Sequence, residues 1–205
     1  STTTLSAFAS ASSGTAIEGL ISSDTTWSAS GSPYVVTGSV LVSEGVKLTV
    51  EAGVEVKFSS GTSLQVFGEL VAKGTSSSGI TFTSAQESKA AGDWGQIVFY
   101  DSSVDAVFDG DGNYVSGSIL EYCTVEYGSG ILLNLGNPFI NQSTIRYHSS
   151  TGIKMDSPQS QSGVSIKITN NTISNNTHSS DGGGICLQGY GAVIISGNTI
   201  SDNIA

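Results

Sequence analysis

The chain has 205 residues, and its 17 Asp and Glu outnumber its 7 Lys and Arg, which gives a formal net charge of −10 at pH 7. This charge disfavours nucleic acid as a partner, and it would repel an anionic polysaccharide unless divalent cations intervened. No run of 18 or more apolar residues occurs, so the sequence predicts no transmembrane segment. Gly, Thr, Val and Ile are abundant while strong helix formers are scarce, which favours an all-β chain with many turns.

The chain begins at Ser1 without a Met, and its polar, Lys-poor composition is typical of proteins outside the cell. We therefore expect an extracellular or cell-surface protein whose signal peptide has been removed, although an excised fragment would begin in the same way.

The first 33 residues differ in composition from the rest, because a Ser/Thr/Ala tract opens the chain. The tract contains the isolated apolar residues Leu5 and Phe8, and it is followed by Ile17, Leu20 and Ile21. The last three are spaced as in one short amphipathic helical turn. We interpret residues 1–33 as an N-terminal arm or cap over the apolar end of a second segment, residues 34–205.

From Tyr34 onward, short runs of alternating apolar and polar residues predict strands. These runs are residues 35–36, 40–42, 48–50, 54–58, 64–67 and 80–82. Gly or Ser-Gly corners separate them, without the Asn-Gly or Asp-Gly pairs of tight antiparallel hairpins. The pattern therefore favours a chain that keeps turning in one rotational sense.

Four later segments share one short pattern, an apolar residue followed by a polar or small corner, Thr and a β-branched residue. They are residues 120–125, 140–145, 168–173 and 195–200, and they recur after 20, 28 and 27 residues. Such recurrence is typical of a solenoid. Alignment on the Thr predicts two inward ladders and a corner between them: Leu120, Ile140, Ile168 and Ile195; Val125, Ile145, Ile173 and Ile200; and, at the corner, Cys123, Ser143, Asn171 and Asn198. An Asn at this corner is expected to bond the backbone of the adjacent coil.

A third ladder follows three glycines and predicts which side chains face outward. Its inward pairs are Ile131/Leu133, Ile153/Met155 and Ile185/Leu187, which leaves Leu132, Lys154 and Cys186 on the surface. Cys186 then lies about two coils, or roughly 10 Å, from Cys123 along the axis. A disulfide requires Cα atoms within about 7 Å, so we expect two free thiols.

Three stretches resemble a known group of proteins. Residues 38–58 resemble the opening coils of right-handed parallel β-helix domains in secreted and cell-surface bacterial or archaeal proteins. Residues 93–99 with 117–128 resemble their central coils, and the segment after Phe139 resembles the parallel β-helix repeat of the pectate-lyase-like superfamily. The resemblance covers residues 34–205 and implies an all-β fold, a right-handed single-stranded parallel β-helix (solenoid) with an N-terminal arm or cap. Enzymes, adhesins and structural fibres share this fold, so it implies no one activity.

Polysaccharide lyases and hydrolases of this fold carry carboxylates and a basic residue on the outside of one sheet. The Asn-Thr-Asp, Asp-Asp and Gly-His-Gly motifs of galacturonan hydrolases are absent here, as are the paired arginines and Asp-His element of pectate lyases. The one cluster with acid–base potential is Arg146-Tyr147-His148, in a loop after a strand. We therefore predict no catalytic residues and a protein that is not an enzyme.

An acidic loop offers oxygen ligands at alternate positions, as Ca²⁺ prefers: Asp105, Asp109, Asp111 and Asn113. The match to a calcium loop is partial, because Tyr114 stands where such a loop needs Gly and Leu120 where it needs Glu. We favour a solvated insertion between two coils, with calcium as the alternative and no other cofactor. His178 and Asp181 are interpreted as loop residues rather than ligands.

Glycosylation sequons occur at Asn141, Asn170 and Asn175. A place for Asn170 in the corner region would disfavour it, which leaves Asn141 and Asn175 as the predicted acceptors.

The pattern after Ile195 ends on a strand–corner–strand unit without a capping helix. We expect either further β-helix coils or a second copy to cover such an end, and a head-to-tail homopolymer would follow in the second case. The predicted assembly interface consists of Leu5, Phe8, Ile17, Leu20, Ile195, Ile200 and Ile204. The leading hypothesis is thus a non-enzymatic structural or surface-assembly protein.

The alternative is a carbohydrate-binding adhesin module with an outward aromatic strip, for which the candidates are Tyr100, Tyr122, Tyr127 and Tyr147. A fragment of a polysaccharide lyase or hydrolase is the third hypothesis.

Overall fold

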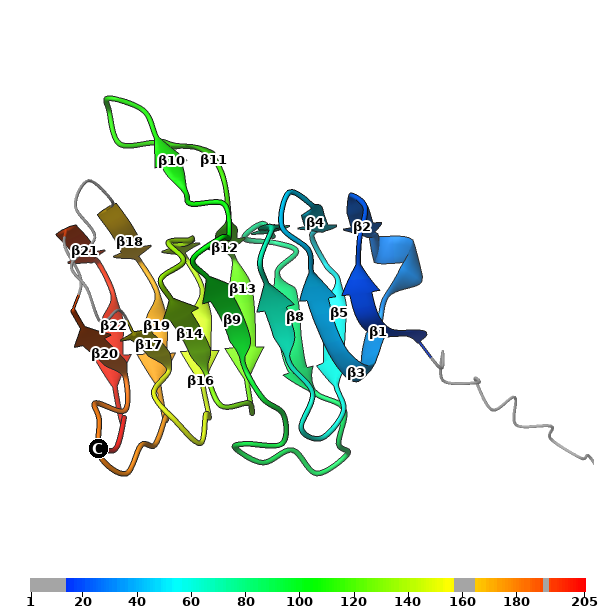
Figure 1. Cartoon of the computed structure of the whole chain (residues 1–205). Helices are drawn as coiled ribbons and strands as arrows, with labels where there is room; N and C mark the ends of the chain where they lie inside the picture. The colour runs from blue at the N-terminus through cyan, green and yellow to red at the C-terminus, as the bar shows by residue number, and fades with distance from the viewer. Residues whose placement is uncertain (1–13, 157–164, 190–191) are drawn as a thin grey trace, which may run out of the picture.

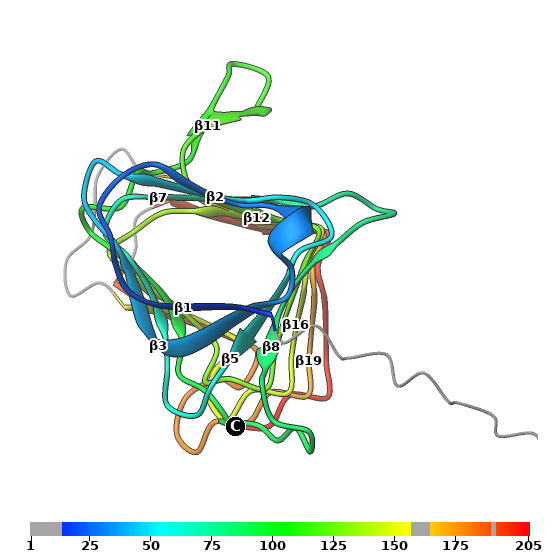
Figure 2. The same ribbon diagram turned by 90° about the vertical axis from the view of Figure 1, so that its right-hand side faces the viewer.

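The computed structural model describes residues 14–156, 165–189 and 192–205, and the predicted arm residues Leu5 and Phe8 lie outside this part. The chain winds into stacked coils whose strands form three faces (Figures 1 and 2), and the side chains that point inward form an apolar core. Every strand pair between neighbouring coils is parallel, which confirms the all-β fold of parallel coils.

The first face is a sheet made of β2 (Thr25–Trp27), β4 (Lys47–Val50), β7 (Glu69–Lys73), β12 (Ile119–Glu121), β15 (Phe139–Asn141), β18 (Ser165–Thr169) and β21 (Ala192–Ser196). The second face consists of β5 (Glu55–Phe58), β8 (Ile80–Ser84), β13 (Cys123–Glu126), β16 (Thr144–Arg146), β19 (Thr172–Ser174) and β22 (Thr199–Ser201). The third face consists of β6 (Leu64–Val66), β9 (Ile97–Tyr100), β14 (Ile131–Asn134), β17 (Ile153–Asp156) and β20 (Ile185–Gln188). Two longer strands, β1 (Thr15–Ile21) and β3 (Tyr34–Val42), pass from the second face into the third.

The solenoid begins earlier than the sequence pattern predicts. Strand β1 pairs with β3 and β2 pairs with β4, so the first coil starts at Thr15 rather than at Tyr34. The helical turn expected over residues 17–21 is wrong, because this segment is extended and Gly19 at φ 84° takes up a shift of register within it. Parallel pairing satisfies the backbone groups of the segment, whereas a single isolated helical turn is unstable in water. A short 3₁₀ turn, η1 (Ala29–Gly31), follows β2.

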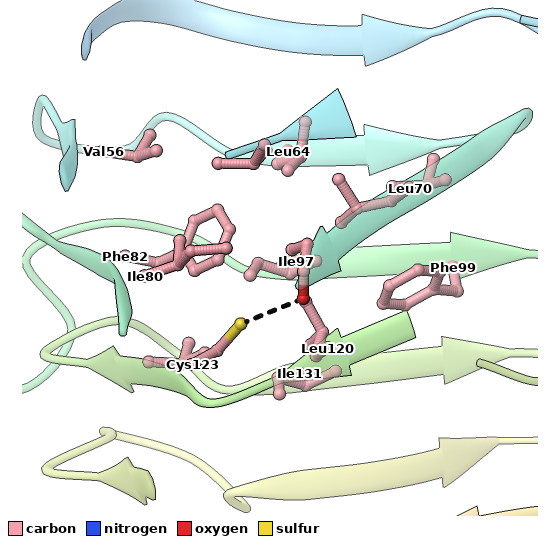
Figure 3. Packing of buried hydrophobic residues seen from close by; sticks show 14 of the residues in the cluster. Val56, Leu64, Leu70, Ile80, Phe82, Ile97, Phe99, Leu120, Cys123 and Ile131 are labelled. Carbon is pink, nitrogen blue, oxygen red and sulfur yellow. Dashed lines mark hydrogen bonds between the residues drawn. The ribbon is translucent and has the colours of Figure 1, made fainter. Parts of the chain in front are cut away.

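The predicted ladders are confirmed residue for residue. Leu120, Ile140, Ile168 and Ile195 follow one another on the first face, and Val125, Ile145, Ile173 and Ile200 on the second. The third ladder pairs Ile131 with Ile153 and Ile185, and Leu133 with Met155 and Leu187. Each fully buried Ile or Leu contributes roughly 2–3 kcal/mol relative to an exposed one. Figure 3 shows part of this interior, where the Cys123 sulfur points at the Ala72 carbonyl oxygen, 3.5 Å away.

An antiparallel hairpin interrupts the coils between β9 and β12. Its strands are β10 (Val107–Phe108) and β11 (Tyr114–Ser116), and it stands away from the body of the solenoid in Figures 1 and 2. The turn is Asp109-Gly110-Asp111-Gly112-Asn113, in which the Asp109 carboxylate accepts the backbone N–H groups of Asp111 at 3.0 Å and Asn113 at 2.8 Å. The acidic loop is thus an insertion between coils, and its carboxylate closes a turn.

Candidate functional site

The corner between the first and second faces is a ladder of side chains, each of which bonds the backbone of the preceding coil. Ser143 Oγ accepts the Cys123 N–H, Asn171 Oδ1 accepts the Ser143 N–H, and Asn198 Oδ1 accepts the Asn171 N–H, at 3.0, 2.9 and 2.8 Å. The Asn171 and Asn198 amides also donate to Ile140 and Ile168 carbonyls. The predicted structural role of this corner is confirmed, because these bonds satisfy backbone groups in a tight bend.

A second ladder at the corner after the second face was not predicted. Its members are Gly128, His148, Asn176 and Asn203, and each of the last three accepts the backbone N–H of the member before it. His148 Nδ1 accepts from Gly128 at 3.2 Å, so the other ring nitrogen carries the proton and donates to the Val125 carbonyl at 3.1 Å. The imidazole therefore makes the same two kinds of hydrogen bond as an Asn at this corner. Burial lowers the pKa of His148 to about 4.

Arg146 of the predicted acid–base cluster lies on the outside of the second face, whereas His148 is buried. Its guanidinium bonds the buried Glu126 carboxylate at 2.8 and 2.9 Å, and Thr83 donates to the other carboxylate oxygen at 3.0 Å. Lys89 lies 3.8 Å from the same carboxylate. Arg146 and Glu126 thus neutralise one another, and His148 lies in the wall of the solenoid.

The four tyrosines proposed as an aromatic strip do not form one. Tyr127 and Tyr147 stack with ring centroids 5.3 Å apart at the second corner, whereas Tyr100 stacks on Phe67 of the third face at 4.1 Å. Tyr122 lies at the first corner with φ 51°. The prediction of one outward aromatic strip made of these four rings is therefore wrong.

The predicted calcium ligands are not brought together. Asp105 Oδ1 accepts the backbone and side-chain N–H groups of Asn137, while Asp109 bonds Asn113 within the hairpin turn. Among residues 14–156, 165–189 and 192–205, no group of three or more His, Cys, Asp or Glu side chains is placed to hold a metal ion. The loop geometry explains the alternating oxygens as turn formers.

His178 and Asp181 lie in the loop before β20, as predicted. Lys154 donates to the Asp181 carboxylate at 3.0 Å, which lowers the pKa of Asp181. His178 Nδ1 accepts the backbone N–H groups of Ser180 and Asp181. His178 thus orders its own loop, and Asp181 ties this loop to β17.

The predicted glycan acceptors differ in accessibility. The Asn141 side chain is buried, and its amide donates to Glu121 while its carbonyl oxygen accepts from Thr169. Asn141 as an acceptor is therefore a wrong prediction for the folded chain, since the glycan would need the nitrogen that Glu121 binds. Asn175 is exposed at the second corner, and its modification stays a prediction.

The two thiols are free, as predicted, and their surroundings differ. Cys123 is buried, and burial raises its thiol pKa, whereas Cys186 lies half-buried on the outer side of the third face beside Lys154. Since the thiolate is the reactive form, we expect a disulfide reagent to modify Cys186 in the folded protein and Cys123 only after unfolding. Absorbance of the released thiolate measures this, and a Cys186→Ser variant should react only in denaturant. Equal rates for both thiols in the folded chain would contradict the assignment.

A polar groove lies between the hairpin and the outer side of the first face. It has a volume of about 370 Å³ and is lined by Lys73, Gly112, Asn113, Tyr114, Glu121, Phe139, Asn141, Thr169 and Asn170. No pattern in the sequence places these residues together, because they come from four coils and the insertion. Tyr114 lies at the groove with its pKa raised to about 12 by burial and by the carboxylates of Glu69 and Glu121.

Comparison with known families finds two matches that together cover most of the chain. Residues 19–129 match the pectate-lyase like beta helix domain, and residues 107–204 match the right handed beta helix region. The coils are therefore right-handed, as expected. A comparison with curated proteins and one with solved structures give no significant match. No helix within the described part of the chain has the length and apolar character needed to cross a membrane.

Proposed function

Since the chain belongs to the pectate-lyase-like β-helix family, whose fold serves several functions, we propose from its own side chains that it is a non-catalytic structural solenoid that assembles end to end. The proposal has two parts, the absence of catalysis and the mode of assembly.

The non-catalytic part rests on how the groups in and around the predicted acid–base cluster Arg146-Tyr147-His148 are used. Catalysis of proton transfer requires a group within hydrogen-bond reach of a bound substrate. The imidazole of His148 is buried in a corner ladder, and the Glu126 carboxylate is buried beneath Arg146 and Thr83. These groups hold the coils together, which supports a structural role.

The single observation that supports assembly is the exposure of the inward-ladder side chains in the last described coil. Leu187, Ile195 and Ile200 occupy the same columns as the buried Met155, Ile168 and Ile173. They are 47, 38 and 49 % exposed. Core positions thus open to solvent on one end of the described coils, and the surface that fits them is another β-helix coil, either a further coil of the same chain or, as we propose, the first coil of a second copy.

The first coil offers a matching surface. A hollow of about 360 Å³ lies there, lined by Ala16, Ile17, Glu18, Ile21, Thr25, Trp27 and Val40. Through the parallel registers, Ile21 heads the column that ends at Leu187, and Trp27 heads the column that ends at Ile195. A second copy stacked in register would therefore continue these columns at the usual strand spacing of about 4.8 Å. Ile17 belongs to this surface, whereas Leu20 is on the outward row beside Leu41.

Such a contact is heterologous and non-closing, so it leads to filaments. A location outside the cell stays part of the proposal, and the polar, acidic composition supports it.

The doubly substituted chain Ile195→Asp, Ile200→Asp should lose assembly while the coils stay folded. Both side chains are exposed in the single chain, so the charges cost little there, but burial of an unpaired carboxylate in the contact costs several kcal/mol. We expect association to weaken by at least about 100-fold, which corresponds to roughly 3 kcal/mol. Sedimentation velocity at increasing protein concentration measures it.

The matched control is Val115→Asp, because Val115 is 59 % exposed on the hairpin, away from both ends. It should assemble as the unsubstituted chain does. The proposal is wrong if the unsubstituted chain stays monomeric at about 100 µM, or if the doubly substituted chain assembles equally well.

A further inference from the structure

We propose that the groove between the β10–β11 hairpin and the outer side of the first face binds an uncharged saccharide, about two sugar rings long. This site goes beyond the proposed structural role. It also differs from the flat aromatic strip that the sequence suggested, since one aromatic wall and a polar floor replace a row of tyrosines.

The floor of the groove is a row of polar side chains, each fixed by the next. Lys73 lies 3.7 Å from one Glu121 carboxylate oxygen, and the Asn141 amide donates to the other at 2.9 Å. Thr169 and Asn170 both donate to the Asn141 carbonyl oxygen, at 2.8 and 3.2 Å. The row crosses strands β7, β12, β15 and β18 and ends at the first corner, and it holds its donors and acceptors in place before any ligand arrives.

The wall of the groove is the inner side of the hairpin. Tyr114 lies nearly parallel to Phe139 at 6.1 Å between ring centroids, and Phe108 packs edge-on against Phe139 at 5.2 Å. Lys167 from β18 donates to the Gly112 carbonyl at 2.9 Å and lies 3.8 Å from the Phe108 ring centroid. The hairpin is thus fastened over later coils, toward which it reaches in Figure 1.

The chemistry of the lining favours a saccharide. A sugar ring presents alternating hydroxyl groups along its rim and C–H groups on its face, and it pairs with mixed donors and acceptors beside an aromatic ring. The groove offers carboxylate lone pairs of Glu121, ammonium protons of Lys73 and the amide of Asn113, next to the rings of Tyr114 and Phe139. Its volume lies at the small end of the range for ligand sites, which suits two sugar rings.

The charges favour an uncharged ligand. Lys73 is paired with Glu121, and Glu69 and Glu121 both act on Tyr114, so an anionic sugar would meet carboxylates rather than a free cation. The net charge of −10 adds a repulsive field over the whole surface. A uronate-containing saccharide should therefore bind more weakly than its neutral counterpart.

Titration followed by amide NMR tests the site. The probes are neutral disaccharides and tetrasaccharides of glucose, mannose, galactose and N-acetylglucosamine, with digalacturonate as the anionic counterpart. At about 0.3 kcal/mol per non-hydrogen atom, a disaccharide reaches a Kd of about 10 µM at best, and we expect values between this and about 5 mM. Shifts should appear at residues 110–114, 121, 139–141 and 169–170.

Two variants locate the binding. Glu121→Gln keeps the shape of the floor, and Tyr114→Ala removes the aromatic wall; each should raise the Kd at least about 5-fold. Tyr147→Ala is the matched control, because Tyr147 is an exposed tyrosine at the second corner and its loss should leave the Kd unchanged. Amide signals of the third face report whether each variant is folded, and Glu121→Gln decides the question if Tyr114→Ala loses its hairpin.

The proposal is overturned if no neutral saccharide shifts the groove signals at 20 mM, or if digalacturonate binds more tightly than they do. It is equally overturned if Glu121→Gln binds as well as the unsubstituted chain, or if Tyr147→Ala weakens binding as much as Tyr114→Ala.

Discussion

Replacement of Ile173 by Asp should unfold the C-terminal coils. Ile173 is fully buried between Ile145 and Ile200 in the second-face ladder. The substitution removes a branched aliphatic side chain and places a carboxylate among apolar neighbours, and the two effects together cost more than about 4 kcal/mol. Because each coil of a solenoid rests on its neighbours, the loss should spread from β18 to β22 and spare the coils before β12. Limited proteolysis with mass spectrometry locates the unfolded segment, and circular dichroism measures the lost strand content.

Thr172→Asp is the control for this experiment. Thr172 precedes Ile173 on the same strand, but its side chain is exposed, so the change should cost no more than about 1 kcal/mol. Ile168→Asp on the first face should behave as Ile173→Asp does, because Ile168 is fully buried too. If the Ile173→Asp and Thr172→Asp variants had the same melting temperature, the second-face ladder would not determine the stability of these coils.

The repeats from Leu120 onward could be placed from the sequence because two constraints act on them together. A strand alternates its faces with a period of two residues, and each corner needs a residue with a left-handed backbone followed by a side chain that bonds the preceding coil. Tyr122, Gln142 and Asn170 take the left-handed positions at φ 51, 47 and 57°. The backbone N–H of the residue after each of them is bonded by the corresponding side chain of the following coil, which fixes the register, so the pattern of apolar residues and amides predicts which columns stack.

The missed elements lack one of those constraints. Strand β1 contains Gly19 and mostly exposed side chains, so its alternation is weak, and pairing with β3 decides its conformation. Strand β7 does alternate buried Leu70 and Ala72, but only Gly68 separates it from the preceding apolar run, so the pattern does not mark it as a separate strand. The Asp-Gly pairs that close the turn of the hairpin are a hairpin signal, but the same residues also fit the alternating oxygen ligands of a calcium loop.

The second corner ladder and the groove could not be predicted from one sequence alone. His148 stands in a column with Asn176 and Asn203, and only its geometry shows that an imidazole replaces an amide there. The groove joins Lys73, Tyr114 and Asn141, which are far apart along the chain and meet only because an insertion folds back over later coils. Register within the coils follows from local pattern, whereas an insertion's resting place depends on contacts such as that of Lys167 with Gly112.

His148 should make the solenoid sensitive to acid in a defined window. Its pKa is about 4 in the folded chain and about 6.5 in the unfolded chain, so the folded state favours the neutral ring. The stabilisation is fully present above pH 6.5 and is lost as the pH falls from 6.5 through 4. A shift of this size corresponds to about 3 kcal/mol. The hydrogen bonds of His148 predict the same loss of stability in acid, because a proton on Nδ1 would point at the Gly128 N–H that now donates to this nitrogen. Thermal melts between pH 7.5 and 4 measure the effect.

His148→Asn separates this ring from the carboxylates that also titrate in acid. An Asn should accept the Gly128 N–H and donate to the Val125 carbonyl, as Asn176 and Asn203 do with their own partners. We expect it to keep stability within about 1.5 kcal/mol at pH 7.5 and to lose the decline between pH 6.5 and 4. His148→Ala leaves the Gly128 N–H and the Val125 carbonyl without partners and should cost about 2–4 kcal/mol at every pH above 6.5. An Asn variant as acid-sensitive as the unsubstituted chain would place the titrating group elsewhere, and an Ala variant of full stability would remove His148 from the ladder.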